Sequence, residues 1–174
     1  LIMNSRAIYW REHYRNVHQL SDKEGIAKSL EYSNERVRFQ TLAHVLEGIG
    51  NPLGKHILDA GCGWGSMSLI LHHCGARVSA IDNVRETIEE LQKRYPFISW
   101  KPLNLMDVNE LSYLPKYDRI VSVETLQYVD FESVIESLWS HLNRGGRLVA
   151  SVPNSSCQIV RKVAQREGSN WAPI

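Results

Sequence analysis

The segment HILDAGCGWGSMSL, residues 56–69, places three glycines within five positions, directly after an apolar run and an acid. A glycine inside an element costs about 0.5–1 kcal/mol relative to alanine, because its free backbone loses more conformational freedom on folding. This pattern is therefore typical of a turn where backbone amides approach a ligand closely. The alternative is a tight strand-to-helix turn that binds nothing. The glycines in question are Gly61, Gly63 and Gly65.

A second candidate, Asp82, directly follows the stretch RVSAI at residues 77–81. A carboxylate there can accept hydrogen bonds from two ribose hydroxyls, as a nucleotide-type ligand requires. The dinucleotide fingerprint G-x-G-x-x-G/A fits less well, because the chain has Ser66 at its last position. The alternative for Asp82 is a cap at the N-terminus of the next helix.

These residues are positioned by strands and helices that alternate along the chain. The sequence predicts strands at 57–59, 77–82, 98–103, 117–124 and 147–152. It predicts helices at 66–74, 85–95 and 156–167. Two further helices are predicted from apolar residues on one face, the first by Leu42, Val45, Leu46 and Ile49 and the second by Val134, Ile135, Leu138 and Leu142. A capping box at Ser21–Glu24 opens a short helix, and a loop is expected up to Lys116. This order predicts an α/β fold with a mostly parallel sheet covered on both faces. Ligands of such sheets bind beyond the carboxyl ends of the strands, where the glycine turn and Asp82 are both expected.

Composition narrows the class of protein. A chain of 174 residues with a formal net charge of +1 predicts one domain without strong attraction to nucleic acid or acidic membranes. The seven histidines show no metal-ligand spacing, and no apolar run reaches the roughly 18 residues of a membrane span. The cysteines form no CxxC pair, which argues against disulfides or zinc and favours a reducing, cytoplasmic compartment. They are Cys62, Cys74 and Cys157.

Five segments together resemble the class I S-adenosylmethionine-dependent methyltransferases. They are ILDAGCGWGSMSL, VSAID, LMD, YDRIVSVETLQYV and LNRGGRLVASVPN, in order between residues 56 and 154. The resemblance implies a Rossmann-like, doubly wound sheet with strand order 3-2-1-4-5 and N-terminal helices. It also implies S-adenosylmethionine as cofactor, S-adenosylhomocysteine as product, and methyl transfer by in-line displacement. The block (D/N)PP(Y/F/W) of amino-methylating nucleic-acid enzymes is replaced by VETLQ, which favours a small-molecule acceptor over nucleic acid.

The same resemblance implies roles for individual residues. Asp82 would accept both ribose hydroxyls, and Asp107 would accept the adenine amino group beside the Met106 backbone. Glu124 would border the reacting methyl group and is the first candidate for a general base, followed by Tyr128. The alternatives are a solvated turn acid at Asp107 and an ordinary exposed acid at Glu124. The full set expected at the cofactor is Asp59, Gly61, Cys62, Gly63, Gly65, Asp82, Asn83, Met106, Asp107, Glu124, Tyr9, Trp10 and Tyr14.

Tyr9, Trp10 and Tyr14 are expected in a lid, because aromatic faces attract a sulfonium cation. Packing into the core is the alternative for each ring. The predicted organisation is a helical lid segment at 1–50, a cofactor-binding core at 51–155, and a helix with a tail at 156–174.

The family adds two strands after the fifth, and this chain shows no such hairpin up to residue 174. The edge of the fifth strand would then pair with a second copy or a further C-terminal segment. This feature favours an alternative function, a truncated or partner-dependent cofactor-binding module without independent catalysis. A weaker alternative is an NAD-dependent oxidoreductase, which Ser66 disfavours.

Overall fold

A computed structural model describes residues 35–154 of the chain, with side chains from residue 40. The predicted lid aromatics at 9, 10 and 14, the capping box at 21–24 and the helix at 156–167 lie outside these residues. The described elements are α3 (Glu35–Ile49), β1 (His56–Ala60), α4 (Ser66–His73), β2 (Arg77–Asp82), α5 (Arg85–Arg94), β3 (Ser99–Pro102), α6 (Val108–Ser112), β4 (Tyr117–Val123), η1 (Leu126–Tyr128), α7 (Phe131–Ser140) and β5 (Leu142–Ser151).

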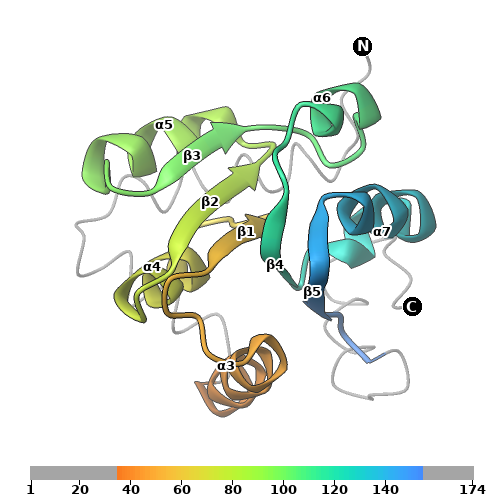
Figure 1. The fold of residues 1–174 in the computed structure, drawn as a ribbon. Helices are drawn as coiled ribbons and strands as arrows, with labels where there is room; N and C mark the ends of the chain where they lie inside the picture. The colour runs from red at the N-terminus through yellow and green to blue at the C-terminus, as the bar shows by residue number, and fades with distance from the viewer. Residues whose placement is uncertain (1–34, 155–174) are drawn as a thin grey trace, which may run out of the picture.

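The five strands form one parallel sheet in the order β3-β2-β1-β4-β5 (Figure 1). This confirms the predicted fold class and strand order. Asp59 pairs with Ala80 of β2 and with Val121 of β4. Because neighbouring strands run in parallel, the segments that leave β1, β2 and β4 start at the same edge of the sheet.

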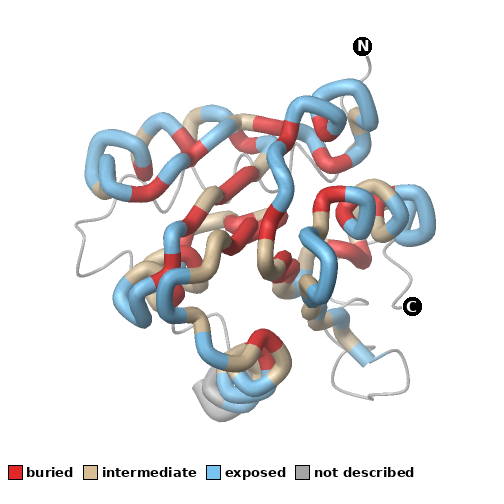
Figure 2. The backbone as a smooth tube through the Cα atoms, in the orientation of Figure 1, coloured by how far each residue is buried: buried red, intermediate tan, exposed pale blue. Residues whose placement is uncertain are grey.

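Two hydrophobic clusters cover the two faces of the sheet, as expected for a parallel sheet buried on both sides. One face packs against α3, α4 and α5, through side chains such as Ile49, Leu71 and Ile88. The other packs against α6, η1 and α7, with Leu111 and Leu138 fully buried. Figure 2 shows buried positions, in red, along β1, β2 and β4 and at points on the helices, whereas β5 has none. None of the described helices is long and apolar enough to cross a membrane.

The segment before Lys116, predicted as a loop, contains the short helix α6. Asp107 begins this helix, since its side chain accepts from the amides of Asn109 and Glu110 at 3.0 and 3.2 Å. The prediction was wrong because five residues are too few to show a helical repeat. The 3-10 turn η1 escaped prediction for the same reason.

The boundary between α7 and β5 also differs from the prediction. The apolar spacing predicts Leu142 in the helix, but α7 ends at Ser140 and Leu142 opens β5, paired with Tyr117. The next pair along is Arg119 with Arg147, so β5 carries extra residues at this irregularity, including Gly145 with φ 74°. Gly145 and Gly146, which were expected to form a turn before the strand, therefore lie within an irregular stretch of β5.

Candidate functional site

The glycine turn after β1 is bound to β2 by three backbone amides. The amides of Gly61 and Cys62 donate to the carbonyl of Ile81 at 2.8 and 3.0 Å. The amide of Gly63 donates to Oδ2 of Asp82 at 2.9 Å. The turn and the acid that the sequence singled out are thus in direct contact.

The backbone of this turn is left-handed at Gly61, Gly63 and Gly65, with φ of 80°, 50° and 74°. Side chains other than glycine rarely adopt such angles. In addition, a Cβ at position 61 would overlap the side chain of Thr125, and one at position 65 would lie 2.5 Å from the Trp100 ring. Two of the three glycines are therefore required by the packing of the chain itself.

Asp59 lies beneath the turn and is fully buried. Burial raises the pKa of its carboxyl to about 6, and Ser68 partly opposes this by donating its hydroxyl at 2.6 Å. Burial also raises the pKa of the neighbouring Cys62 thiol, with the carboxylates of Asp82 and Asp59 adding to the shift. Cys62 is therefore a protonated, buried thiol, and the Asp59 carboxyl is bound to Ser68 at the start of α4.

Asp82 closes β2 with both carboxylate oxygens in use. Oδ2 accepts from Gly63, and Oδ1 accepts from the amide of Val84 at 3.0 Å. Burial raises the pKa of Asp82, and the backbone donors at Val84 and Gly63 act against that shift. The cap position of α5 is Val84, so Asp82 does not cap that helix at its N-cap position. The next residue, Asn83, is exposed.

The loop after β3 presents Asp107 and Met106. Oδ1 of Asp107 accepts both cap bonds of α6, which leaves Oδ2 without a hydrogen bond to the described residues. Met106 is half exposed, and its sulfur accepts from the amide of Asp130 at 3.1 Å. Asp107 is thus a helix cap with one oxygen available to a ligand.

An open hollow lies beside the carboxyl ends of β2 and β3, which are paired at Asp82 and Pro102. Its lining comes from the segments next to Asp82 and Asp107, and it is predominantly polar. The residues are Asn83, Arg85, Pro102, Leu103, Asn104 and Glu110.

Glu124 follows β4 with φ 52°, the one left-handed angle outside glycine in residues 35–154. Its amide donates to the carbonyl of Ser151 at 2.9 Å, and its carbonyl accepts from Nε2 of Gln127 at 2.7 Å. Such a backbone costs about 1–3 kcal/mol and persists only where neighbours enforce it. The side chain of Glu124 is exposed, and that of Tyr128 in η1 is half buried.

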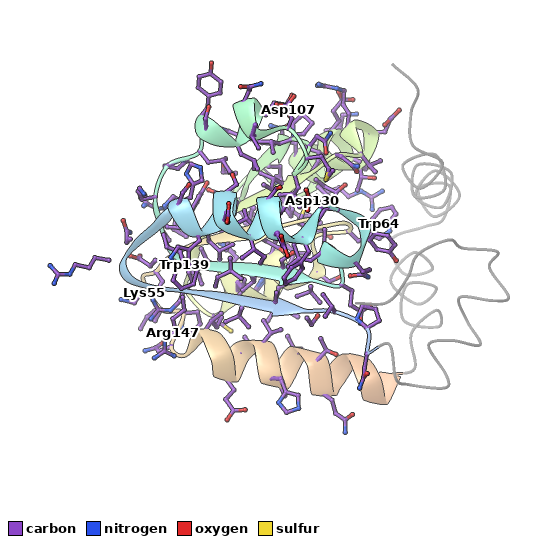
Figure 3. The ribbon with its side chains drawn as sticks, turned by 90° about the vertical axis from the view of Figure 1, so that its right-hand side faces the viewer. Lys55, Trp64, Asp107, Asp130, Trp139 and Arg147 are labelled. Carbon is purple, nitrogen blue, oxygen red and sulfur yellow. The ribbon has the colours of Figure 1, made fainter. Side chains whose placement is uncertain are left out.

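In Figure 3, Trp64 and Asp130 lie at the opposite side of the molecule from Lys55, Trp139 and Arg147.

The sequence model of the family described as "Methyltransferase domain" matches residues 57–146, which contain the turn, Asp82, Asp107 and Glu124. The chain belongs to the S-adenosylmethionine-dependent methyltransferases. S-adenosylmethionine is accordingly its cofactor, and the weaker NAD-dependent alternative is set aside.

Relatives and solved structures agree with this family. The trans-aconitate 2-methyltransferase of Mycobacterium sp. (strain KMS) is 32% identical over 137 residues, which cover 75% of this chain and 51% of the relative. The mitochondrial ubiquinone biosynthesis O-methyltransferase of Homo sapiens is 30% identical over 154 residues, covering 80% and 41%. The chain thus spans about half the length of the curated relatives it matches.

Two solved structures match most of the chain and share its fold. The DhpI-SAM-HEP complex has a TM-score of 0.65 at 20% identity and covers 95% of this chain and 71% of its own. Magnesium protoporphyrin IX methyltransferase of Synechocystis PCC 6803, with bound SAH, has a TM-score of 0.62 at 20% identity, with 95% and 74% covered.

Sequence reasoning missed two contacts that shape the turn. Thr125 and Trp100 occupy the space that the glycines leave open, and neither was singled out. Thr125 is 64 residues from Gly61, so no local pattern connects them. The chain offers no signal for such a pair short of the fold itself.

The raised pKa of Asp59 predicts a stability difference that grows with pH. The folded chain holds this proton up to about pH 6, whereas an ordinary aspartate releases it near 3.8. Ionisation of Asp59 therefore opposes folding, and its cost appears as pH rises from about 4 to 6. Asp59→Asn removes that cost, so its free energy of unfolding relative to the parent should climb across this window by on the order of 1–3 kcal/mol.

Urea unfolding at a series of pH values measures this difference. Asp118→Asn is the control of opposite sign, because the His56 amide and the Asn143 side chain lower the pKa of Asp118. A pH-independent difference for Asp59→Asn would show that the buried carboxyl titrates normally.

Proposed function

We propose that this chain binds S-adenosylmethionine between the glycine turn, Asp82 and Asp107, and transfers its methyl group to a small-molecule acceptor by in-line displacement. The observation that carries the proposal is the 2.9 Å bond from the Gly63 amide to Asp82. It brings the turn and the acid together at the carboxyl edge of the sheet, where ligands of this fold class bind.

The carboxylate of Asp82 fits a ribose with two hydroxyls. Its oxygens accept the backbone amides of Gly63 and Val84, and the Asn83 amide also acts on the carboxylate, so part of the acceptor capacity of about four lone pairs is left for a ligand. Its partly desolvated position strengthens further hydrogen bonds, because fewer water molecules compete for the same oxygens. Hydroxyl donors would also favour the charged form that burial disfavours.

The adenine end of the cofactor fits the loop after β3. Oδ2 of Asp107 is available to the amino group, next to the Met106 backbone and the hollow near Asn83. The methionine end is assigned to the segment 59–65. Tyr9, Trp10 and Tyr14 are proposed as the aromatic lid.

When bound, S-adenosylmethionine supplies a methyl group already activated by a positive sulfonium. The residues of the chain then mainly position the reactants, and alignment contributes up to about 7–11 kcal/mol in favourable cases. Glu124 is proposed as the general base for an acceptor that loses a proton, with Tyr128 as the second candidate. The left-handed backbone of Glu124 supports this role, since backbone strain is often found at functional sites.

The names of the relatives, trans-aconitate 2-methyltransferase and ubiquinone biosynthesis O-methyltransferase, support a small-molecule acceptor. The alternative is a cofactor-binding module that needs a partner or a further segment for catalysis. Two observations favour this alternative. The chain covers about half the length of its relatives, and β5 lies at the outer side of the described sheet. A second copy or a C-terminal segment would then pair with that edge.

Loss of the Asp82 charge should weaken cofactor binding. We expect S-adenosylhomocysteine to raise the melting temperature of the parent chain, because it binds only the folded state. Asp82→Asn should reduce the affinity by about 1.5–3 kcal/mol, the usual contribution of hydrogen bonds to a charged group. Thermal unfolding measures the melting temperature, and isothermal titration calorimetry measures the affinity.

Asp118→Asn is the matched control, because Asp118 also accepts a backbone amide but lies at the start of β4. Its affinity should equal that of the parent. A folded Asp82→Asn variant with parental affinity would remove Asp82 from the site.

The two roles of Asp107 can be separated by substitution. Serine also caps helices well, so Asp107→Ser should keep α6 and the melting temperature while losing the free carboxylate oxygen. We expect S-adenosylhomocysteine to bind this variant about tenfold more weakly, since a charge-assisted bond to adenine is lost. Calorimetry and thermal unfolding report the two effects independently. Unchanged affinity would leave Asp107 as a helix cap alone.

Methyl transfer distinguishes the enzyme from the binding module. With labelled S-adenosylmethionine and a metabolite extract, we expect label in the small-molecule fraction. Glu124→Gln should lower that rate at least about a hundredfold, the lower range for general-base catalysis. A chain that binds the cofactor but transfers no label would favour the module.

A further inference from the structure

The glycine turn is held from two sides by different means. On the side of β2, three amides anchor it to Ile81 and Asp82. On the side of β4, the hydroxyl of Thr125 donates to the carbonyl of Gly61 at 3.1 Å. Within residues 35–154, this hydrogen bond joins the turn to the segment after β4.

Thr125 and Gly61 are also complementary in shape. The methyl and hydroxyl groups of Thr125 fill the space where a Cβ at position 61 would lie. A larger residue at 61 would have to displace Thr125, because its Cβ would overlap that side chain. The single hydroxyl proton of Thr125 is shared between the carbonyls of Gly61 and Val123, the latter at 3.2 Å. The hydroxyl and the missing Cβ therefore fix the same pair of backbone segments against each other.

The segment that carries Thr125 is rigid for reasons of its own. Glu124 is bound through its amide to the carbonyl and hydroxyl of Ser151, at 2.9 and 3.2 Å. The carbonyl of Glu124 accepts from Gln127, whose side chain is buried. Any tilt of this segment would therefore be transmitted to the turn through Thr125, and the reverse also holds.

We infer that Thr125 is a positioning residue that fixes the glycine turn to the Glu124 segment, so that the cofactor side and the acceptor side of the site form one unit. This inference rests on the proposed function for what the two sides bind. A comparable hydrogen bond is made by Ser122, whose hydroxyl donates to the carbonyl of Ala60 at 2.9 Å. Ser122 joins the same two strands but lies before the turn and is fully buried.

The test removes each hydroxyl separately. Thr125→Val keeps the branched shape and loses the bond to Gly61, Thr125→Ser keeps the bond, and Ser122→Ala loses the bond to Ala60. For each folded variant, calorimetry gives the dissociation constant for S-adenosylhomocysteine, and thermal unfolding gives the melting temperature. Amide hydrogen exchange at positions 61–65 without ligand reports the rigidity of the turn.

We expect Thr125→Val to bind S-adenosylhomocysteine about three- to tenfold more weakly and to exchange the turn amides faster. Thr125→Ser should stay within about twofold of the parent in affinity. Ser122→Ala should lower the melting temperature but leave affinity and turn exchange near the parental values.

Parental affinity and exchange in Thr125→Val would overturn the inference, as would an equal loss of affinity in Ser122→Ala. The exchange measurement separates this inference from the proposed function. If the parent does not bind S-adenosylhomocysteine but Thr125→Val still loosens the turn, the proposed function fails and the positioning role stands.

Discussion

The site depends on one hydrogen bond, from the amide of Gly63 to the carboxylate of Asp82. It is possible only because β1 and β2 are parallel and in register, with Ala60 beside Ile81, so that the turn after one strand meets the end of the other. A carboxylate in this half-buried position loses hydration, which raises its pKa. The backbone donors at Gly63 and Val84 compensate part of that loss. The same bond thus holds the turn in its left-handed path and keeps the acid in place.

The glycines of the turn serve the fold as well as any ligand. The missing side chain at Gly61 accommodates Thr125, and that at Gly65 accommodates Trp100. A glycine-rich turn can therefore arise from packing between β1, β3 and β4 alone, which is why the motif by itself left the binding and non-binding interpretations open. What favours a ligand is the combination of the turn with a nearby acid that retains acceptor capacity.

The sequence predicted the larger elements because hydrophobic periodicity is clear over eight or more residues, as in α5 and α7. It failed for α6, although Asp107 followed three residues later by Glu110 has the spacing of a capping box. In the structure the Glu110 carboxylate accepts from the amide of Asn104, whereas the amide of Asp107 donates to the carbonyl of Asn104, so the reciprocal bond of a capping box does not form. The contacts of Thr125 with Gly61 depend on strand order and had no local signal. The left-handed backbone of Glu124 likewise depends on β5, through Ser151.

The fold brings several helix ends to each edge of the sheet, and charged side chains lie near them. Each of α4, α5, α6 and α7 begins after a strand ends, so their N-termini lie at the carboxyl edge of the sheet. The positive ends of these helix dipoles favour carboxylates there, and Asp59, Asp82 and Asp107 all occupy this edge. At the opposite edge, Arg119 and Lys116 donate to the last carbonyls of α3 and α7, at Ile49 and Ser140. Arg119 and Lys116 are thus bound at helix ends, whereas Asp59, Asp82 and Asp107 are three acids at the carboxyl edge. An edge with several carboxylates suits a ligand that offers hydroxyl and amino donors and carries a positive sulfonium, which is the chemistry of S-adenosylmethionine.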